Sequence, residues 1–162
     1  MLYNSNMKKL KLYLETSIFN VATSDQSPEN RDATLKLFAK LNSNEESYDI
    51  YTSLLVLQEI DQSSDKRAKE LRDCVNSLNL EILEEHPEIE NIAGEYISKE
   101  LITINHIDDA RHVATATYYE LDIIVSWNFE HIVKYTMRKN ITLVNSLIGY
   151  KSLEILAPME VD

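Results

Sequence analysis

Short apolar runs alternate with longer amphipathic segments along the chain, and this alternation predicts the fold class. The short runs predict β-strands at 10–14, 49–52, 80–83, 123–125 and 141–144. Apolar residues at three- and four-residue spacing predict helices at 28–41, 54–60, 65–78, 87–97, 106–120 and 132–137. Strands that alternate with helices indicate an α/β fold with a mostly parallel central sheet.

The same pattern predicts one domain over residues 1–162, without repeats or a low-complexity linker. Residues 18 and 19 are expected to continue the first strand after a polar break. Residues 153–156 either add an edge strand or pack against the body, as part of a tail over 150–162. Met7 offers an alternative start, so we expect residues 1–7 to be disordered.

Composition excludes several classes of protein. The chain has only two glycines, and glycine-rich phosphate loops need several close together. Its one cysteine, Cys74, excludes an internal disulfide and a multi-cysteine zinc site, and suits a reducing compartment. No apolar run is long enough to cross a membrane, and Glu15 interrupts the N-terminal apolar stretch too early for a secretory signal. We therefore expect a cytoplasmic protein without a membrane partner.

The net charge is −11, from 16 Lys and Arg against 27 Asp and Glu. This balance disfavours a nucleic-acid partner, because phosphate binding normally needs a basic face. Carboxylates around a divalent metal also contribute negative charge, however, and the metal neutralises it. The acidity therefore lowers the expectation of a nuclease without excluding one, and it also suits a basic partner.

Polar residues follow two of the predicted strands, at 15–17 and 126–128. Ligands of parallel α/β folds bind outside the carboxyl ends of the strands, so these positions carry special weight. Two further acids, Glu59 and Asp109, lie on the helices expected nearby. If the strand ends converge, Glu15, Glu59, Asp109 and Asn128 share a pocket.

Three carboxylates in one pocket repel each other unless they are protonated or bind a cation. Hard oxygen ligands without a thiolate suit Mg²⁺ or Mn²⁺. Such a metal lowers the pKa of a bound water and stabilises the leaving oxygen of a phosphodiester. The candidate chemistry is therefore metal-dependent phosphodiester hydrolysis.

These residues resemble a known family. The segment LYLETSIFN at 12–20 looks like the opening strand of PIN-domain proteins, in which an acid is followed two residues later by Ser or Thr. Ser53 with Glu59 resembles the family's second-acid helix, and DARHVATA at 109–116 resembles its third. The segment SWNFEHI at 126–132 is similar to the loop of VapC-like members, as is the tail at 149–158. The resemblance spans nearly the whole chain, with the motifs in order.

The resemblance implies a three-layer α/β/α domain and a metal-dependent ribonuclease that uses Mg²⁺ or Mn²⁺. It also implies an RNA substrate, and in many members an antitoxin protein and a homodimer. Glu15, Glu59 and Asp109 would be the acidic metal ligands, and Asn128 would take a fourth, commonly acidic, position. Ser17 and Ser126 would orient carboxylates or a metal-bound water.

Two departures from the family pattern bear on catalysis. The first acid is usually Asp, whereas Glu15 moves its carboxylate outward by one methylene, and Asn128 keeps an oxygen but lacks the charge. The alternative is therefore a catalytically degraded PIN-like module that binds RNA or a protein partner. A small-molecule phosphatase is disfavoured, because no Asp-x-Asp nucleophile motif is present.

Several other polar residues have a structural interpretation as well as a functional one. His112 shares a helix face with Asp109 and either orients it, contacts substrate, or is simply packed and hydrogen-bonded. The spacing of His106, Asp109 and His112 drifts around the helix, which argues against a transition-metal site there. His131 is expected to stabilise its loop. Basic clusters at 66–72 and 134–139, and Arg111, either meet RNA or are solvated.

Overall fold

The computed structural model describes residues 8–43 and 47–162, so the expectation for residues 1–7 lies outside the described residues. Five strands form one sheet in the order β3-β2-β1-β4-β5, and every neighbouring pair is parallel. The strands are β1 (Leu10–Leu14), β2 (Tyr48–Ser53), β3 (Glu81–Leu83), β4 (Ile123–Val125) and β5 (Glu154–Leu156). The predicted α/β class with a parallel sheet is confirmed.

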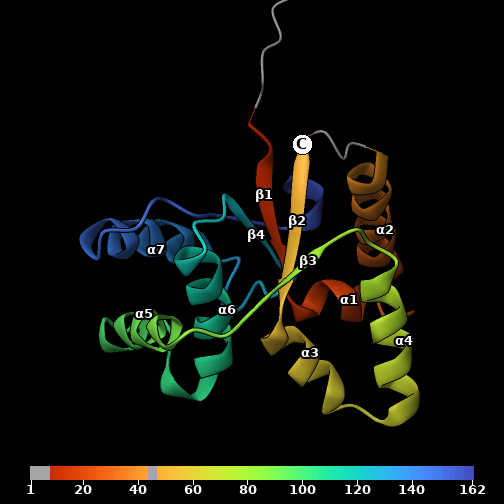
Figure 1. Cartoon of the computed structure of the whole chain (residues 1–162), viewed down its shortest axis with the longest axis horizontal. Coiled ribbons are helices and arrows are strands. Elements are labelled where there is room, and N and C mark those ends of the chain that lie inside the picture. Colours follow the sequence, from red (N-terminus) through yellow and green to blue (C-terminus); the bar gives the residue numbers. More distant parts are fainter. Residues whose placement is uncertain (1–7, 44–46) are drawn as a thin grey trace, which may run out of the picture.

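Helices cover the sheet on both sides, which confirms the three-layer arrangement. Figure 1 shows α2 and α4 on one side of the strands and α5, α6 and α7 on the other. The helices are α1 (Thr16–Ala22), α2 (Pro28–Ser43), α3 (Leu54–Asp61), α4 (Asp65–Asn76), α5 (Pro87–Ser98), α6 (Ile107–Tyr118) and α7 (Tyr135–Leu147), with 3₁₀ turns η1 (Ile104–His106) and η2 (Pro158–Glu160). Among the described residues, none of these helices is both long and apolar enough to span a bilayer.

The carboxyl half of the central strand β1 is fully buried. Leu12, Tyr13 and Leu14 have no exposed surface. Parallel strands flanked by helices are apolar on both faces, and β1 and β4 follow this rule. The core therefore lies on both sides of the strands whose carboxyl ends lead into the candidate site.

Polar side chains at the carboxyl ends of two strands start the next helices. Glu15 directly follows β1, and its side chain accepts a hydrogen bond from the backbone N–H of Ser17 at the start of α1. Ser53 ends β2 and caps α3 through a bond from the backbone N–H of Val56. These caps satisfy N–H groups that a helix start leaves unpaired. The capping role fixes both side chains at the sheet edge where parallel α/β folds bind ligands.

Three local predictions are wrong. The helix predicted at 132–137 begins only at Tyr135. Residues 141–144 belong to α7 rather than to a strand, because Met137, Ile141 and Val144 form one buried stripe at helical spacing. Residues 18 and 19 lie in α1, since the Glu15 cap turns the chain into a helix directly after β1. In the tail, residues 154–156 form β5, which extends the sheet beside β4.

A buried hydrogen-bonded triangle joins the three helices on one side of the sheet. The Tyr96 hydroxyl of α5 donates to Asn145 Oδ1 of α7 over 2.6 Å. It lies 2.9 Å from the Thr117 hydroxyl of α6, to which Asn145 Nδ2 also donates over 3.0 Å. Burial raises the pKa of Tyr96, so this phenol stays neutral and keeps its proton for the triangle.

We expect Tyr96→Phe to lower the free energy of unfolding by about 1–3 kcal/mol, because it leaves Asn145 Oδ1 buried without a donor. Urea unfolding followed by circular dichroism measures the effect. Tyr119→Phe is the matched control, since the Tyr119 hydroxyl donates to the Glu84 carbonyl in an exposed position. Equal losses in the two variants would show that the triangle adds nothing to stability.

Candidate functional site

Glu15 is a buried carboxylate fixed by the start of α1. It is 5% exposed and accepts hydrogen bonds from the backbone N–H of Ser17, at 3.1 Å, and from the Ser17 hydroxyl. Burial raises the pKa of Glu15, although the charge of His112, the Ser17 N–H and the Ser126 hydroxyl act in the opposite direction. Glu15 is therefore positioned by its neighbours but lacks a full counter-charge.

Glu59 reaches the same region from α3. Its carboxylate accepts a hydrogen bond from the Thr16 hydroxyl, and its two oxygens lie 3.0 and 3.1 Å from His112 Nε2. Burial alone would raise the pKa of Glu59, but the bonds from His112 and Thr16 and the charge of His112 together lower it. Glu59 is thus the acid of the site that already has a cationic partner.

His112 of α6 is the common neighbour of the three predicted acids. It is 2% exposed, and its Nδ1 lies 2.8 Å from the Tyr13 hydroxyl, which in turn lies 2.8 Å from Ser53 Oγ. Burial disfavours its charged form, but the hydrogen bond to Glu59 and the charges of Glu59, Glu15 and Asp109 outweigh burial and raise the pKa of His112. His112 therefore contacts Glu59, and the charges of all three carboxylates act on it.

Asn128 orients Asp109. Its Nδ2 donates to Asp109 Oδ1 over 3.1 Å, and its Oδ1 accepts from the backbone N–H of His131 over 3.0 Å. Its own backbone N–H donates to Ser126 Oγ over 2.9 Å. The side-chain oxygen of Asn128 is thus already bonded within the loop after β4. Asn128 places the acid and does not turn a spare oxygen toward it.

Asp109 lies in the first turn of α6 and is half-buried. Burial raises its pKa, while the charges of His131, His112 and His106 lower it, and Glu59 adds to the rise. Like Glu15, Asp109 is therefore a carboxylate that its surroundings compensate only in part.

The structure brings the predicted acids into one electrostatic unit but not into direct contact. The charge of Glu59 raises the pKa of both Glu15 and Asp109, so the three groups sense each other. In the described part of the chain, however, a different set of residues is close enough to share one metal ion. His106, Asp109 and His131 each offer a ligand atom within 4.8 Å of the other two. The three carboxylates are more widely spaced than that set.

The donor types suit Mg²⁺ or Mn²⁺, and the spacing lets at most two of the three carboxylates bind one ion directly, the others acting through its waters. Mg²⁺ keeps several waters and binds through one or two carboxylates, so its protein ligands need not touch each other. The donors are carboxylate oxygens, the type that these ions prefer. Glu15 and Asp109 have raised pKa values, as expected for acids that lack a counter-charge a cation would supply.

Ser17 connects the first acid to the loop after β4. Its hydroxyl donates to Glu15 and accepts a hydrogen bond from the backbone N–H of Trp127 over 2.8 Å. The indole of Trp127 donates to the Thr34 hydroxyl of α2, also over 2.8 Å. This loop is therefore anchored to two helices, which fixes the position of Asn128 relative to Glu15.

Tyr13 was not predicted from the sequence as part of the site. It has the pattern of a core residue in an apolar strand, and only the fold brings it against His112 of α6. Thr16 carried weight as one of residues 15–17, directly after the strand, but without an assigned role. In the structure it bonds Glu59 rather than either of its neighbours, Glu15 and Ser17.

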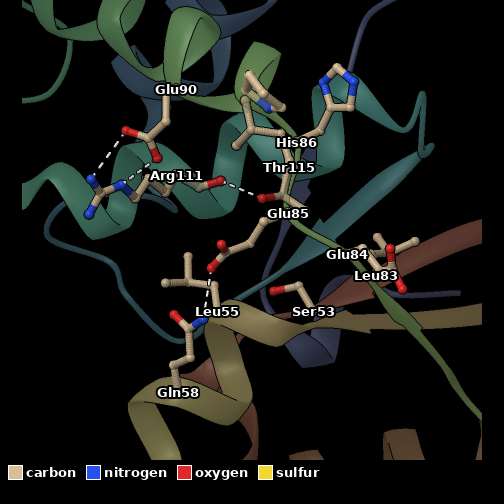
Figure 2. Close-up of a pocket in the computed structure, with 12 residues that line it drawn as sticks. Ser53, Leu55, Gln58, Leu83, Glu84, Glu85, His86, Glu90, Arg111 and Thr115 are labelled. Atoms are coloured by element: carbon tan, nitrogen blue, oxygen red, sulfur yellow. Dashed lines mark hydrogen bonds and ion pairs between the residues drawn. The ribbon is translucent and has the colours of Figure 1, made fainter.

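A cavity of about 490 Å³ opens beside the site, next to Ser53 (Figure 2). Arg111 is the only Lys or Arg that lines it, and its guanidinium is paired with Glu90, at 2.8 and 3.1 Å, and with Asp108, at 2.8 Å. Figure 2 shows Arg111 and Glu90 turned toward one another along the cavity wall. Because this cation is neutralised and further acids line the wall, the cavity does not suit a phosphate.

The basic cluster at 66–72 is also largely occupied. Arg67 donates to the backbone carbonyls of Thr23 and Asn20, over 3.0 and 3.2 Å. Lys69 pairs with Asp73, and Arg72 pairs with Asp61. These residues therefore hold α4 to its surroundings and form solvated ion pairs, which agrees with the second of the two interpretations.

No protein-family model matches the sequence, and no curated protein does. Solved structures do. VapBC2 from Rickettsia felis, bound to a DNA fragment from its promoter, gives a TM-score of 0.58 at 18% identity, over 91% of this chain and 98% of that one. The chain has a VapC-like PIN fold. Its parallel sheet with helices on both faces is the three-layer α/β/α arrangement that the resemblance implies.

Two further VapC structures show the same fold. VapBC-1 from nontypeable Haemophilus influenzae gives a TM-score of 0.59 at 12% identity, over 93% of this chain and 100% of that one. VapC20 of Mycobacterium tuberculosis, a toxin that cleaves the sarcin–ricin loop, gives 0.55 at 13% identity, over 87% and 97%. At such identities the likeness is one of fold.

The pairing of His112 with Glu59 predicts a pH-dependent stability. The raised pKa of His112 stabilises the fold fully below the unfolded value of about 6.5, and this contribution is lost as the pH rises through the folded value. The lowered pKa of Glu59 contributes only above its unfolded value of about 4.3. Between about pH 4.3 and pH 6.5, both His112 and Glu59 therefore contribute to the stability of the fold.

In metal-free protein with EDTA, we therefore expect His112→Leu to cost about 1–3 kcal/mol of unfolding free energy near pH 5.5, and less at pH 8.5. Urea unfolding across this pH range measures the gap. His86→Asn is the control, because His86 is exposed and Asn can still cap α5. A gap that stays constant or widens toward pH 8.5 would contradict the charged His112–Glu59 pair.

Proposed function

We propose that the chain is a metal-dependent endoribonuclease that hydrolyses RNA phosphodiester bonds with Mg²⁺ or Mn²⁺. The observation that supports this most is the set of Glu15, Glu59 and Asp109 at the carboxyl edge of the sheet, all acting on His112. Two of the three have raised pKa values, as expected for carboxylates that need a cation. The VapC-like fold agrees with this activity.

In this proposal Glu15, Glu59 and Asp109 hold the metal, at most two of them directly and the rest through its waters. When bound, Mg²⁺ or Mn²⁺ lowers the pKa of a water and stabilises the leaving oxygen of the phosphodiester. Ser17 and Ser126 keep Glu15 in place, and Asn128 orients Asp109 by donating to Oδ1. His112 holds both oxygens of Glu59 and balances part of the negative charge. Asn128 thus acts by positioning, not as a fourth ligand.

RNA would approach from the α7 side of the site. Lys134 is the N-cap residue of α7 and makes no ion pair within residues 8–43 and 47–162, whereas Arg138 is paired with Glu160 at 2.8 Å. Lys134 also lines a cavity of about 300 Å³ with the site's neighbours His106 and His131, and with Glu100 and Glu130. An unpaired cation beside the acids suits a phosphate better than the neutralised Arg111 does.

We expect purified protein to cleave a mixed RNA panel with Mn²⁺ or Mg²⁺ and not with EDTA. Asp109→Asn and Glu59→Gln should each lower the rate more than about 100-fold, because each removes a carboxylate that compensates the cation. The matched control is Asp108→Asn, since Asp108 precedes Asp109 and pairs with Arg111 at the surface. Gel analysis of end-labelled RNA reads both the rate and the cut position.

Cleavage that survives in Asp109→Asn, or that continues in EDTA, would point to a contaminating nuclease and count against the proposal. A loss as large in Asp108→Asn as in Asp109→Asn would show a general effect on α6. Unfolding melts of each variant separate loss of fold from loss of chemistry.

We further propose an antitoxin partner, since two of the structural neighbours are VapBC assemblies. The net charge of −11 suits a basic partner segment. The test is a small reading frame adjacent to this one: its product should co-purify with the chain and suppress RNA cleavage. An isolated reading frame would argue against a toxin–antitoxin pair.

The second candidate is a degraded PIN-like module that binds RNA or a protein without cleaving. It is favoured by the Glu59–His112 contact, in which one buried imidazole faces both carboxylate oxygens and competes with a cation. Thermal unfolding with Mn²⁺ distinguishes the two candidates. A nuclease site should gain about 2.7 kcal/mol at 100 times the dissociation constant.

The stabilisation by Mn²⁺ should be smaller in the Glu15→Gln and Asp109→Asn variants than in the parent, and it should be unchanged in Asp108→Asn. A melting curve that Mn²⁺ leaves unchanged, together with RNA binding by the intact chain, would support the module instead. The two measurements are independent of each other, because thermal unfolding follows the binding of Mn²⁺ and the binding assay follows the RNA.

A further inference from the structure

A second group of metal-ligating side chains lies beside the carboxylates. His106 ends η1, Asp109 is in the first turn of α6, and His131 lies in the loop after β4. One ligand atom from each lies within 4.8 Å of the others, and His106 Nδ1 is 3.7 Å from Asp109 Oδ2. The imidazole rings of His106 and His131 are stacked with their centroids 3.7 Å apart.

We propose that His106, Asp109 and His131 bind a transition-metal ion of the Zn²⁺ type. Two imidazole nitrogens and one carboxylate oxygen form the ligand set of open zinc sites, in which the fourth position holds water. Imidazole suits Zn²⁺, Ni²⁺ and Cu²⁺, whereas Mg²⁺ prefers oxygen ligands. The cluster is therefore chemically distinct from the all-carboxylate site, although it shares Asp109.

The distance between His106 and Asp109 is close to the one a metal requires, and the other two ligand pairs lie within 4.8 Å. Ligands bonded to Zn²⁺ at about 2.0–2.1 Å stand about 3.3 Å apart in a tetrahedron. The 3.7 Å between His106 and Asp109 is a few tenths of an ångström longer. The stacked rings have to separate around an ion, and the His106 side chain is 40% exposed on a short 3₁₀ turn, which leaves it room to rotate.

Asn128 already holds two of the three ligands. It donates to Asp109 Oδ1, which leaves Oδ2 on the side of His106. It also accepts from the backbone N–H of His131, which fixes the start of that side chain. Metal sites depend on such outer contacts, whose removal typically costs about 10–100-fold in affinity.

The cluster is open to solvent. Both histidines line the cavity of about 300 Å³ that also contains Lys134 and Asn140. The side chains of Asp109 and His131 are 21% and 29% exposed. An ion can therefore enter without unfolding the loop, and water can fill the fourth position.

Because Asp109 belongs to both groups, binding at the histidine cluster regulates the carboxylate site. A Zn²⁺ ion on Asp109 Oδ2 removes that oxygen and its charge from the Mg²⁺ or Mn²⁺ ligands. Zn²⁺ is therefore an inhibitor of RNA cleavage, a consequence that rests on the proposed nuclease function. Binding itself does not depend on that function.

The test uses the full chain without an affinity tag, freed of metal with EDTA and dialysed. Competition with a chromophoric zinc chelator should show one Zn²⁺ per chain. His106→Ala and His131→Ala should each weaken binding at least about 10-fold, and Asn128→Ala by a comparable factor. His86→Asn, which changes the exposed histidine at the start of α5, should bind as the parent does.

Co²⁺ in place of Zn²⁺ gives a second reading, since tetrahedral coordination produces visible absorption bands that should vanish in the His106→Ala, His131→Ala double variant. Circular dichroism shows whether that variant is folded. Absence of zinc binding at micromolar concentration, or binding that both histidine substitutions leave intact, overturns the site. These measurements contain no RNA, so a failed nuclease leaves them unaffected.

The proposed inhibition by Zn²⁺ is measured as the ratio of the RNA cleavage rates with and without Zn²⁺ in each variant. Zinc should lower cleavage at least about 10-fold in the parent and less in His131→Ala, in line with the loss of affinity. Equal inhibition of the parent and of His131→Ala would contradict the proposed regulation, but it would not contradict the zinc-binding site.

Discussion

The contact between His112 and Glu59 is the interaction on which the candidate site depends. A parallel sheet gathers the residues after its strands at one edge, and here that edge receives three acids. Bringing carboxylates together in a partly dehydrated region is unfavourable without a positive charge nearby. His112 is buried and faces both oxygens of Glu59, and the carboxylates raise its pKa, which favours the protonated form that supplies this charge. Tyr13 and Ser53 continue the chain of bonds into the sheet, so the compensation is built into the core.

This compensation is partial, and its distribution matters for function. Glu59 has a lowered pKa and is the acid that His112 satisfies. Glu15 and Asp109 keep raised pKa values, because burial outweighs the bonds and charges around them. The fold therefore tolerates the three acids without metal while leaving two of them undercompensated. That combination suits a site that exchanges its cation. It also means that the stability of the fold does not depend on a cation bound at the carboxylates.

The sequence was sufficient to predict the α/β class and four of the five strands, because these depend on local periodicity, whereas the shared pocket of the acids stays a prediction. The β-branched residues at 141–144 were misread, since Ile141 and Val144 fit both a short strand and a helical stripe, and only the buried Met137 one turn earlier decides between them. The contacts of Tyr13 and Thr16 depend on how α3 and α6 pack against the sheet. No spacing along the chain encodes that packing.

The histidines show even more clearly that spacing along the chain does not predict contacts between distant segments. Spacing along α6 argued against a metal at His106, Asp109 and His112, and the structure agrees, because His112 turns to Glu59. The missing partner is His131, which the anchored loop after β4 brings to the start of α6. Asn128, placed by the sequence among the candidate ligands, is what ties this loop to Asp109. Asn128 therefore affects the candidate site in two ways. Unlike an acid, it brings no charge of its own, and its amide N–H holds Asp109 Oδ1 while Oδ2 lies 3.7 Å from His106 Nδ1. The same side chain thus limits the negative charge near Asp109 and keeps this carboxylate beside the imidazoles that we propose as its partners.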